Sequence, residues 1–182
     1  MKTLKTLMNE ASLSRVHTHT QGRNIGMITA HRGENTAEEN NRNNAELESH
    51  IRKAGYGFVK VKGRYIENHG TDKARAVDEK SYLVIGKKGD DKGQLLSFLK
   101  KHGEQHGQDS ILHKPHDSEE AHLHGTREGG YPGRGETTSV GTWHPNRASE
   151  FHTAMKGGRT FSFESFEFLR PVSFSNRQES EF

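Results

Sequence analysis

Histidine is the side chain whose number first suggests chemistry, since the 182 residues include 13 of them. Imidazole binds transition metals and exchanges protons near neutral pH. His122 and His124 are separated by one residue, so on a strand they share a face and can chelate a metal with His113 or His116. The sequence has no His-Glu-x-x-His motif and no carboxylate at a fixed ligand spacing. We therefore expect surface histidines, with no metal and no other cofactor.

Two His-Gly-Thr triplets, at residues 69–71 and 124–126, suggest a second kind of chemistry. Paired His-x-Thr motifs are typical of two-histidine phosphoesterases, in which the histidines act as general acid and base. In that class each motif lies on a strand between apolar residues. The second triplet follows Leu123 and has this pattern, whereas the first lies between Asn68 and Asp72 in an expected loop. A phosphoesterase is therefore a secondary alternative.

Residues 125–138 contain five glycines and Pro132, which predicts a loop. Glycines beside an arginine can surround a phosphate, but none of the known phosphate-binding glycine motifs occurs here. A surface loop is the expected structure. The alternative is a lid over a pocket, with Arg127 and Arg134 as partners for an anion.

The elements that would position these residues begin with a short apolar strand at 25–30. Thr36 and Glu39 form a capping box, which predicts a helix to about Ala54, ended by Gly55. Further segments have the patterns of a strand at 56–62, a strand at 82–85, a helix capped by Asp90 or Asp91 and reaching His106, and a strand at 110–113. The order β-α-β-β-α-β predicts an α+β, ferredoxin-like core of four antiparallel strands with both helices on one face.

The C-terminal half predicts a β-rich extension of this core. We expect strands at 121–124, 139–143 and 160–168, the last with a bulge, and a short helix at 145–155. The resulting domain organisation is a leader at 1–10, a linker at 11–24, the core at 25–114, the glycine-rich loop and extension at 115–170, and a disordered tail at 171–182.

Composition limits the function classes. Hydrophobic residues make up 29% of the chain and the mean hydropathy is −1.01, so the core is small and no apolar run is long enough to span a membrane. Without cysteine, the chain has no disulfides, thiolate metal ligands or cysteine nucleophile. The net charge is +3, and the 27 basic residues are scattered among 24 acidic residues. The sequence therefore contains no basic stripe typical of a nucleic-acid groove.

A pattern of single residues runs from the first strand to the third. Thr29-Ala-His-Arg32 ends the first strand, Asn40 lies on the helix, Gly63-Arg-Tyr-Ile-Glu67 follows, and Glu79 precedes the third strand. Over about residues 25–113 this pattern resembles the S-adenosylmethionine lyases of small phages and a related bacterial family of ferredoxin-like domains. Arg42 departs by one position from the Asn-x-x-Arg of the family's first helix.

The resemblance implies roles for these residues. Tyr65 and Glu79 would be catalytic, with Glu79 holding the sulfonium cation or the α-amino group of S-adenosylmethionine, and Tyr65 lying near the sulfonium. Thr29, Arg32, Asn40 and Glu67 would bind the ligand, and the enzyme would be a homo-oligomer, a trimer with its site between subunits. Purely structural roles are the alternative: Tyr65 as a hairpin aromatic, Glu79 paired with Lys80 or Arg64, and Asn40 and Asn44 binding the neighbouring loop.

The first ten residues resemble the capsid-targeting peptides of internal head proteins in large tailed phages. The matching residues are Met1, Lys2, Thr3, Leu7, Met8 and Glu10. In those proteins a prohead protease cuts after the glutamate, which here implies cleavage between Glu10 and Ala11. A simple amphipathic helix is the alternative.

Together these resemblances imply a phage accessory protein that is packaged inside the head and delivered to the host cytoplasm. There it would act in counter-defence by cleaving or binding S-adenosylmethionine. Its partners would be this ligand, the capsid interior and a host defence protein, with no membrane. One alternative is a non-enzymatic internal head protein, and another is a protein inhibitor of a host defence nuclease.

Overall fold

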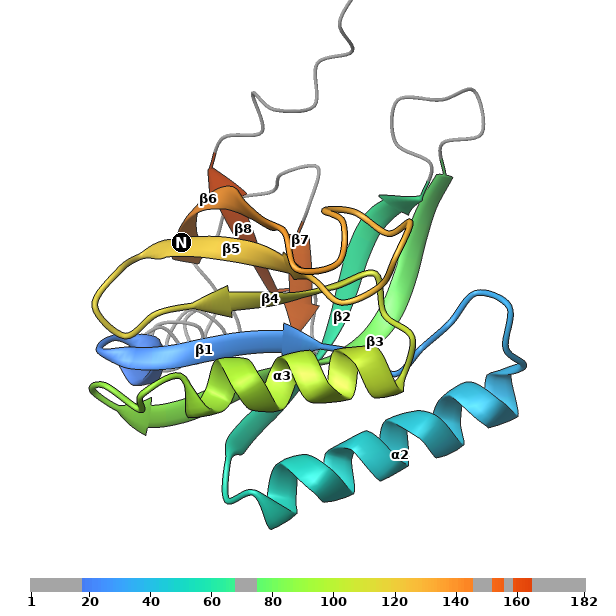
Figure 1. Ribbon diagram of the computed structural model, residues 1–182, viewed down its shortest axis with the longest axis horizontal. Coiled ribbons are helices and arrows are strands. Elements are labelled where there is room, and N and C mark those ends of the chain that lie inside the picture. Colours follow the sequence, from blue (N-terminus) through green and yellow to red (C-terminus); the bar gives the residue numbers. More distant parts are fainter. Residues whose placement is uncertain (1–17, 68–74, 146–151, 156–158, 165–182) are drawn as a thin grey trace, which may run out of the picture.

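The computed structural model describes residues 18–67, 75–145, 152–155 and 159–164, with the side chains of residues 18–61 and 79–143 (Figure 1). Its elements are β1 (Arg23–Ile28), α2 (Ala37–Lys53), β2 (Gly57–Glu67), β3 (Arg75–Lys88), α3 (Gln94–Gln105), β4 (Ser110–Lys114), β5 (Glu120–Gly125), β6 (Thr137–Pro145), β7 (His152–Met155) and β8 (Arg159–Glu164). The predicted order β-α-β-β-α-β is present in the first six.

Two predictions for the C-terminal half have different outcomes. The helix expected at 145–155 is wrong at both of its described ends, because Pro145 ends β6 and residues 152–155 form β7, which pairs with both β2 and β8. A neighbouring strand on each side satisfies the backbone of β7, so pairing overrides its local helical pattern. Residues 146–151 lie outside the described part. The strand expected at 160–168 corresponds to β8. Its predicted bulge, like the leader at 1–10 and the tail at 171–182, lies outside the described residues.

The strands form one closed sheet in the order β1-β3-β2-β7-β8-β6-β5-β4. β1 lies between β3 and β4, and every pair is antiparallel. Both helices lie on one side of the molecule, outside the barrel (Figure 1). The mixed α and β architecture is as predicted. The closure was not predicted: β5–β8 cover the face of the first four strands that the helices leave open.

Two hydrophobic cores follow from this arrangement. Residues from β1 to β6, among them Ile25, Leu83 and the fully buried Trp143, pack together inside the barrel. Between the sheet and the helices, Leu47 of α2 and Leu99 of α3 pack with a second set of strand residues. The strands alternate between the two cores, so that Leu83 points inward while its neighbours on β3 point toward the helices.

Local sequence explains where the helices begin. Thr36 and Glu39 form the predicted capping box of α2: Thr36 Oγ1 accepts from the Glu39 N–H, and Glu39 Oε2 accepts from the Thr36 N–H. Before α3, the Asp91 carboxylate accepts hydrogen bonds from the N–H groups of Gly93 and Leu95. Within the described residues, neither helix is long and apolar enough to cross a membrane.

Candidate active site

The segment that follows β1, residues 29–32, carries part of the predicted site and is held by hydrogen bonds. Thr29 anchors it to β3, because its hydroxyl donates to the Lys80 carbonyl at 2.7 Å. The same oxygen accepts from the His31 N–H at 3.0 Å. The His31 carbonyl in turn accepts from Gln108 Nε2 at 3.0 Å. Residues 29–31 are therefore held by contacts to two separate parts of the chain.

Two buried asparagines of α2 hold the alternate residues of this segment. Asn44 Oδ1 accepts from the Ala30 N–H at 3.0 Å. Asn40 bonds both backbone groups of Arg32, accepting from its N–H at 2.8 Å and donating to its carbonyl at 2.9 Å. Asn40 and Asn44 are 4% and 5% exposed. The prediction that these amides bind the neighbouring loop is confirmed.

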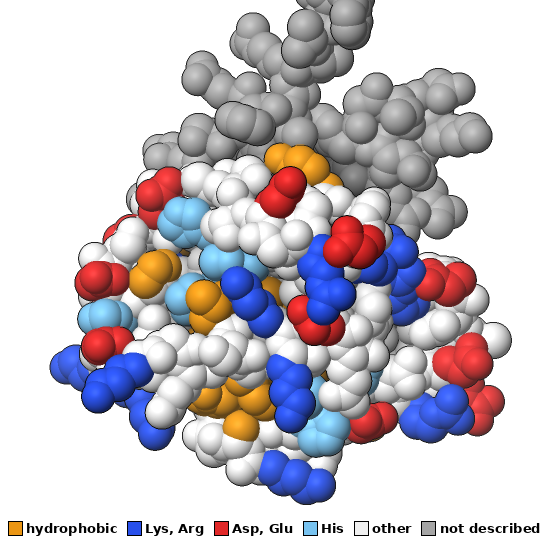
Figure 2. All heavy atoms as spheres, in the orientation of Figure 1, with side chains coloured by type: hydrophobic (Ala, Val, Ile, Leu, Met, Phe, Trp, Pro, Cys, Tyr) orange, Lys and Arg blue, Asp and Glu red, His pale blue; other side chains and the backbone are white. Residues whose placement is uncertain are grey.

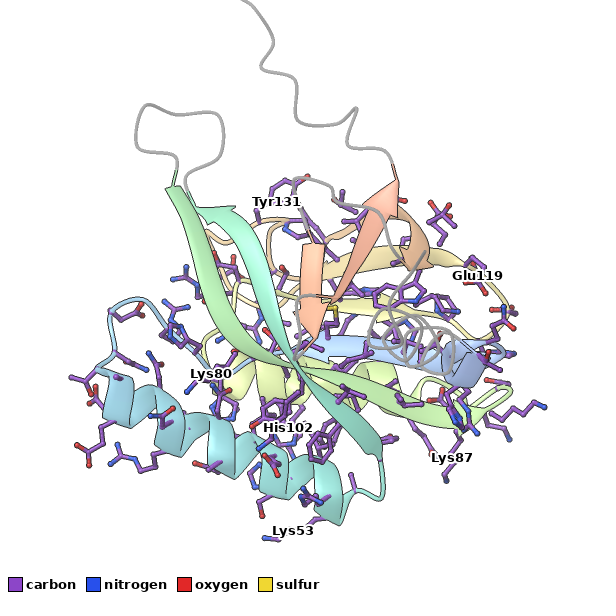
Figure 3. All side chains as sticks on the ribbon, turned by 180° about the vertical axis from the view of Figure 1, so that it is seen from behind. Lys53, Lys80, Lys87, His102, Glu119 and Tyr131 are labelled. Carbon is purple, nitrogen blue, oxygen red and sulfur yellow. The ribbon has the colours of Figure 1, made fainter. Side chains whose placement is uncertain are left out.

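Because α2 holds Ala30 and Arg32, the residue between them turns toward β3. His31 Nδ1 lies 3.4 Å from Glu79 Oε1. Glu79 is 9% exposed, so this carboxylate is largely removed from water. Of the two partners predicted as alternatives for Glu79, Lys80 does not pair with it: Lys80 Nζ donates to Asn41 on α2 at 2.9 Å, and its side chain lies on the helix side of the sheet (Figure 3). The side chain of the other, Arg64, lies outside the described residues.

Glu79 lies on the face of β3 that lines the barrel. It alternates with Ser81 and Leu83, and Leu83 belongs to the barrel core. Its cross-strand partner in β2 is Gly63, which adds no side chain beside it. Tyr65 and Glu67 follow on β2, where their backbones pair with residues 77 and 75 of β3. Their side chains lie outside the described part, but the backbone brings both positions onto the hairpin that carries Glu79.

The Arg32 side chain points away from Glu79, toward the end of α3. Its guanidinium donates to the Gly107 carbonyl, and it forms an ion pair with Glu34 at 2.6 Å. It also lines an open hollow of about 450 Å³ between the start of α2 and the end of α3, together with Arg127 and Glu46. The structure thus brings Thr29, His31 and Glu79 together, whereas Arg32 and Asn40 support the segment from the other side.

Both arginines of the glycine-rich loop lie beside carboxylates. Arg127 Nε donates to Asp109 at 2.6 Å, and Arg134 lies 3.3 Å from Glu104. Figure 2 shows basic and acidic side chains interspersed over the visible face. The two arginines predicted as anion partners are therefore held by carboxylates.

Several of the described histidines lie with their rings close together, in the pairs His50–His102, His102–His106, His113–His124 and His122–His124. Among the described residues, no set of three side chains is arranged to hold a metal ion. His113 and His124 lie on the outer face of β4 and β5, with ring centroids 6.0 Å apart, and burial lowers the pKa of each to about 4. Of the second His-Gly-Thr triplet, Thr126 is buried and donates to the Gln108 carbonyl at 2.6 Å. Residues 69–71 lie outside the described part.

Sequence reasoning did not identify His31 as a site residue. The signal was its place inside Thr29-Ala-His-Arg32, between two residues that the pattern did select. The segment places the imidazole of His31 beside the largely buried carboxylate of Glu79. A carboxylate in such surroundings favours a cationic partner, since low polarity strengthens the attraction between opposite charges.

Comparison with known proteins agrees with the pattern read from the sequence. A search of curated proteins finds no match. The structure is similar to that of a phage S-adenosylmethionine lyase in complex with S-methyl-5′-thioadenosine, with 15% identity, a TM-score of 0.34, and coverage of 66% of this chain and 90% of that one. The sequence model of the S-adenosylmethionine lyase family matches residues 26–166, well over half of the chain. This protein therefore belongs to the S-adenosylmethionine lyase family.

Proposed function

We propose that this protein cleaves S-adenosylmethionine into methylthioadenosine and homoserine lactone. Membership of the lyase family supports the reaction class. The observation that carries the proposal is the Glu79 carboxylate, 9% exposed, on the barrel-lining face of β3. A substrate with a sulfonium and an ammonium group offers this carboxylate two cations to bind.

The reaction needs no nucleophile from the protein. An oxygen of the substrate's own carboxylate forms a bond to Cγ while the Cγ–S bond breaks, and the electron pair stays on sulfur. The sulfonium becomes a neutral thioether, the ammonium keeps its charge, and no proton moves. The contribution left to the enzyme is to fold the methionyl chain so that the carboxylate reaches Cγ, and positioning of this kind lowers barriers substantially.

The change of charge during the reaction assigns a role to Glu79. A carboxylate bound to the sulfonium would lose its attraction as the C–S bond breaks, which would stabilise the substrate more than the transition state. A carboxylate bound to the α-ammonium keeps its attraction throughout. Glu79 is therefore proposed to bind the α-ammonium group, with the Tyr65 hydroxyl or ring near the sulfonium. Glu67 is a proposed ligand contact, and Thr29, Arg32 and Asn40 shape the adjoining wall.

The test uses the full chain, with S-adenosylmethionine as substrate and products followed by mass spectrometry. Glu79→Gln keeps the shape of the side chain and removes its charge, and we expect kcat/KM to fall roughly 10- to 100-fold, since a charged hydrogen bond contributes about 1.5–3 kcal/mol. The matched control is Glu38→Gln, on the exposed side of α2. Wild-type protein that folds but yields neither product would overturn the proposal.

A binding series identifies the group that Glu79 contacts. S-adenosylhomocysteine has the ammonium but no sulfonium, and methylthioadenosine has neither. If Glu79 binds the ammonium, Glu79→Gln weakens binding of S-adenosylmethionine and S-adenosylhomocysteine and leaves methylthioadenosine unchanged. A loss confined to S-adenosylmethionine would assign the carboxylate to the sulfonium instead.

We further propose a biological setting. The protein would assemble as a homotrimer, be packaged in a phage head through residues 1–10, lose them between Glu10 and Ala11, and deplete S-adenosylmethionine in the host cytoplasm as counter-defence. Mass spectrometry of mature particles should find an N-terminus at Ala11, and an intact Met1 would contradict packaging by cleavage. Under the alternatives, an internal head protein or an inhibitor of a host defence nuclease, Glu79→Gln would leave infection or partner binding unaffected.

A further inference from the structure

His31 lies outside any strand, but hydrogen bonds hold both its N–H and its carbonyl. Its N–H donates to Thr29 Oγ1 and its carbonyl accepts from Gln108 Nε2, both at 3.0 Å. The flanking residues Ala30 and Arg32 are held by amides of α2. Because the backbone of residues 30–32 is held by these hydrogen bonds, the fold sets the direction of the His31 side chain.

The ring is directed at the proposed substrate-binding carboxylate. Nδ1 is buried and has no hydrogen-bond partner among the described residues, and the carboxylate oxygen Oε1 of Glu79 lies 3.4 Å from it, within ion-pair distance. The whole side chain is 26% exposed, so its other edge reaches solvent at the end of the barrel. The same Thr29 hydroxyl that accepts from His31 donates to the carbonyl of Lys80, the residue next to Glu79. Thr29 thus connects the backbones of the two partners.

We propose that His31 is a positioning residue for Glu79, holding Oε1 from the β1 side so that the carboxylate is oriented toward the α-ammonium of S-adenosylmethionine. This inference rests on the proposed function. Holding the carboxylate in one orientation matters because a small misplacement of a binding group can cost up to about 100-fold in rate. The ring itself needs no contact with the reacting atoms.

The test compares His31→Leu, which removes the ring nitrogens, with His31→Asn, which keeps an amide N–H near the position of Nδ1. We expect His31→Leu to weaken binding of S-adenosylmethionine and S-adenosylhomocysteine roughly 10-fold, with methylthioadenosine unchanged, and His31→Asn to restore most of the affinity. In a Glu79→Gln background, His31→Leu should cause no further loss, because the residue acts through the carboxylate.

Each other outcome decides against the inference. If His31→Leu binds and turns over S-adenosylmethionine like the wild type, the positioning role is wrong while the proposed function stands. Equal weakening of all three ligands, or an undiminished loss in the Glu79→Gln background, would show only a structural role. A folded wild-type protein without binding or turnover would overturn the proposed function and this inference with it.

Discussion

The side-chain amides of Asn40 and Asn44 make the backbone hydrogen bonds that a neighbouring strand would otherwise make to the residues after β1. After Ile28 the chain leaves the sheet, so its backbone N–H and C=O groups need other hydrogen-bond partners. Each such group that is buried without a partner costs about 1–3 kcal/mol of stability. The two amides supply these partners at Ala30 and Arg32, one turn apart on α2. The asparagines that continue the apolar stripe of α2 therefore have a structural role, which indirectly sets the direction of His31.

Asn40→Ala should lower both stability and activity. It removes two hydrogen bonds from the backbone of Arg32 in a buried place, and we expect the free energy of unfolding to fall by about 1–3 kcal/mol. Because residues 29–32 then lose their fixed path, kcat/KM for S-adenosylmethionine should fall as well. Urea denaturation and product formation measure the two effects. Asn43→Ala, at the surface hollow on the same helix, is the matched control, and equal effects of both changes would refute this role.

At the scale of elements, the close approach of α3 to β1 depends on a strand glycine. An ideal Cβ at Gly26 would lie 2.2 Å from Leu99 Cδ1, a distance that real side chains do not adopt. Gly26 thus allows Leu99 to insert into the core between sheet and helices. The residue Gln108, which follows α3, donates to the His31 carbonyl, so α3 is joined in this way to the segment that carries His31.

Gly26→Ala should destabilise the protein by about 1–3 kcal/mol, the usual cost of overpacking a core. Leu99→Ala in the same chain should recover part of this loss relative to the sum of the two single changes, because it empties the space that the new methyl group needs. Thermal or urea unfolding of the four proteins gives the coupling. Gly57→Ala is the control, since its nearest neighbour would be Ile85 Cβ at 3.9 Å. A strictly additive pair would contradict the steric explanation.

At the scale of the whole molecule, buried histidines outside the barrel make stability depend on pH. Burial lowers the pKa of His102 and His106 between the helices, and it lowers the pKa of His113 and His124 over β4 and β5 to about 4. In the unfolded chain these histidines bind protons below about pH 6.5, whereas in the folded chain burial keeps them neutral to a lower pH. Stability is therefore fully present above that pH and is lost as the pH falls toward 4.

His113→Leu should flatten this dependence. His113 is 7% exposed, and burial lowers its pKa to about 4. The free energy of unfolding of the wild type should therefore fall by about 3 kcal/mol between pH 6.5 and 4 because of this residue, and this part of the fall should be absent in the variant. Urea unfolding at several pH values from about 7 down to about 4 measures the slope. His116→Leu, at a more exposed histidine, is the control. Parallel curves for wild type and His113→Leu would show that this histidine does not cause the acid sensitivity.

The local features of this protein can be read from its sequence. The capping box at Thr36 and Glu39, the order of the first six elements and the pattern from Thr29 to Glu79 depend on residues close together in the chain or on the periodicity of one element. The family also followed from that pattern, since it consists of residue types at fixed spacings, and residues 26–166 match the family.

The way in which these parts meet depends on contacts between distant segments. Closure of the sheet by β5–β8 depends on strands distant in sequence, and β7 forms where a helix was expected because β2 and β8 satisfy its backbone. The His31–Glu79 contact joins residues 48 positions apart and depends on two amides of α2 holding the residues on either side of His31. Pairing and packing between distant segments are not encoded in the spacing of neighbouring residues, which is why these features appear only in the folded molecule.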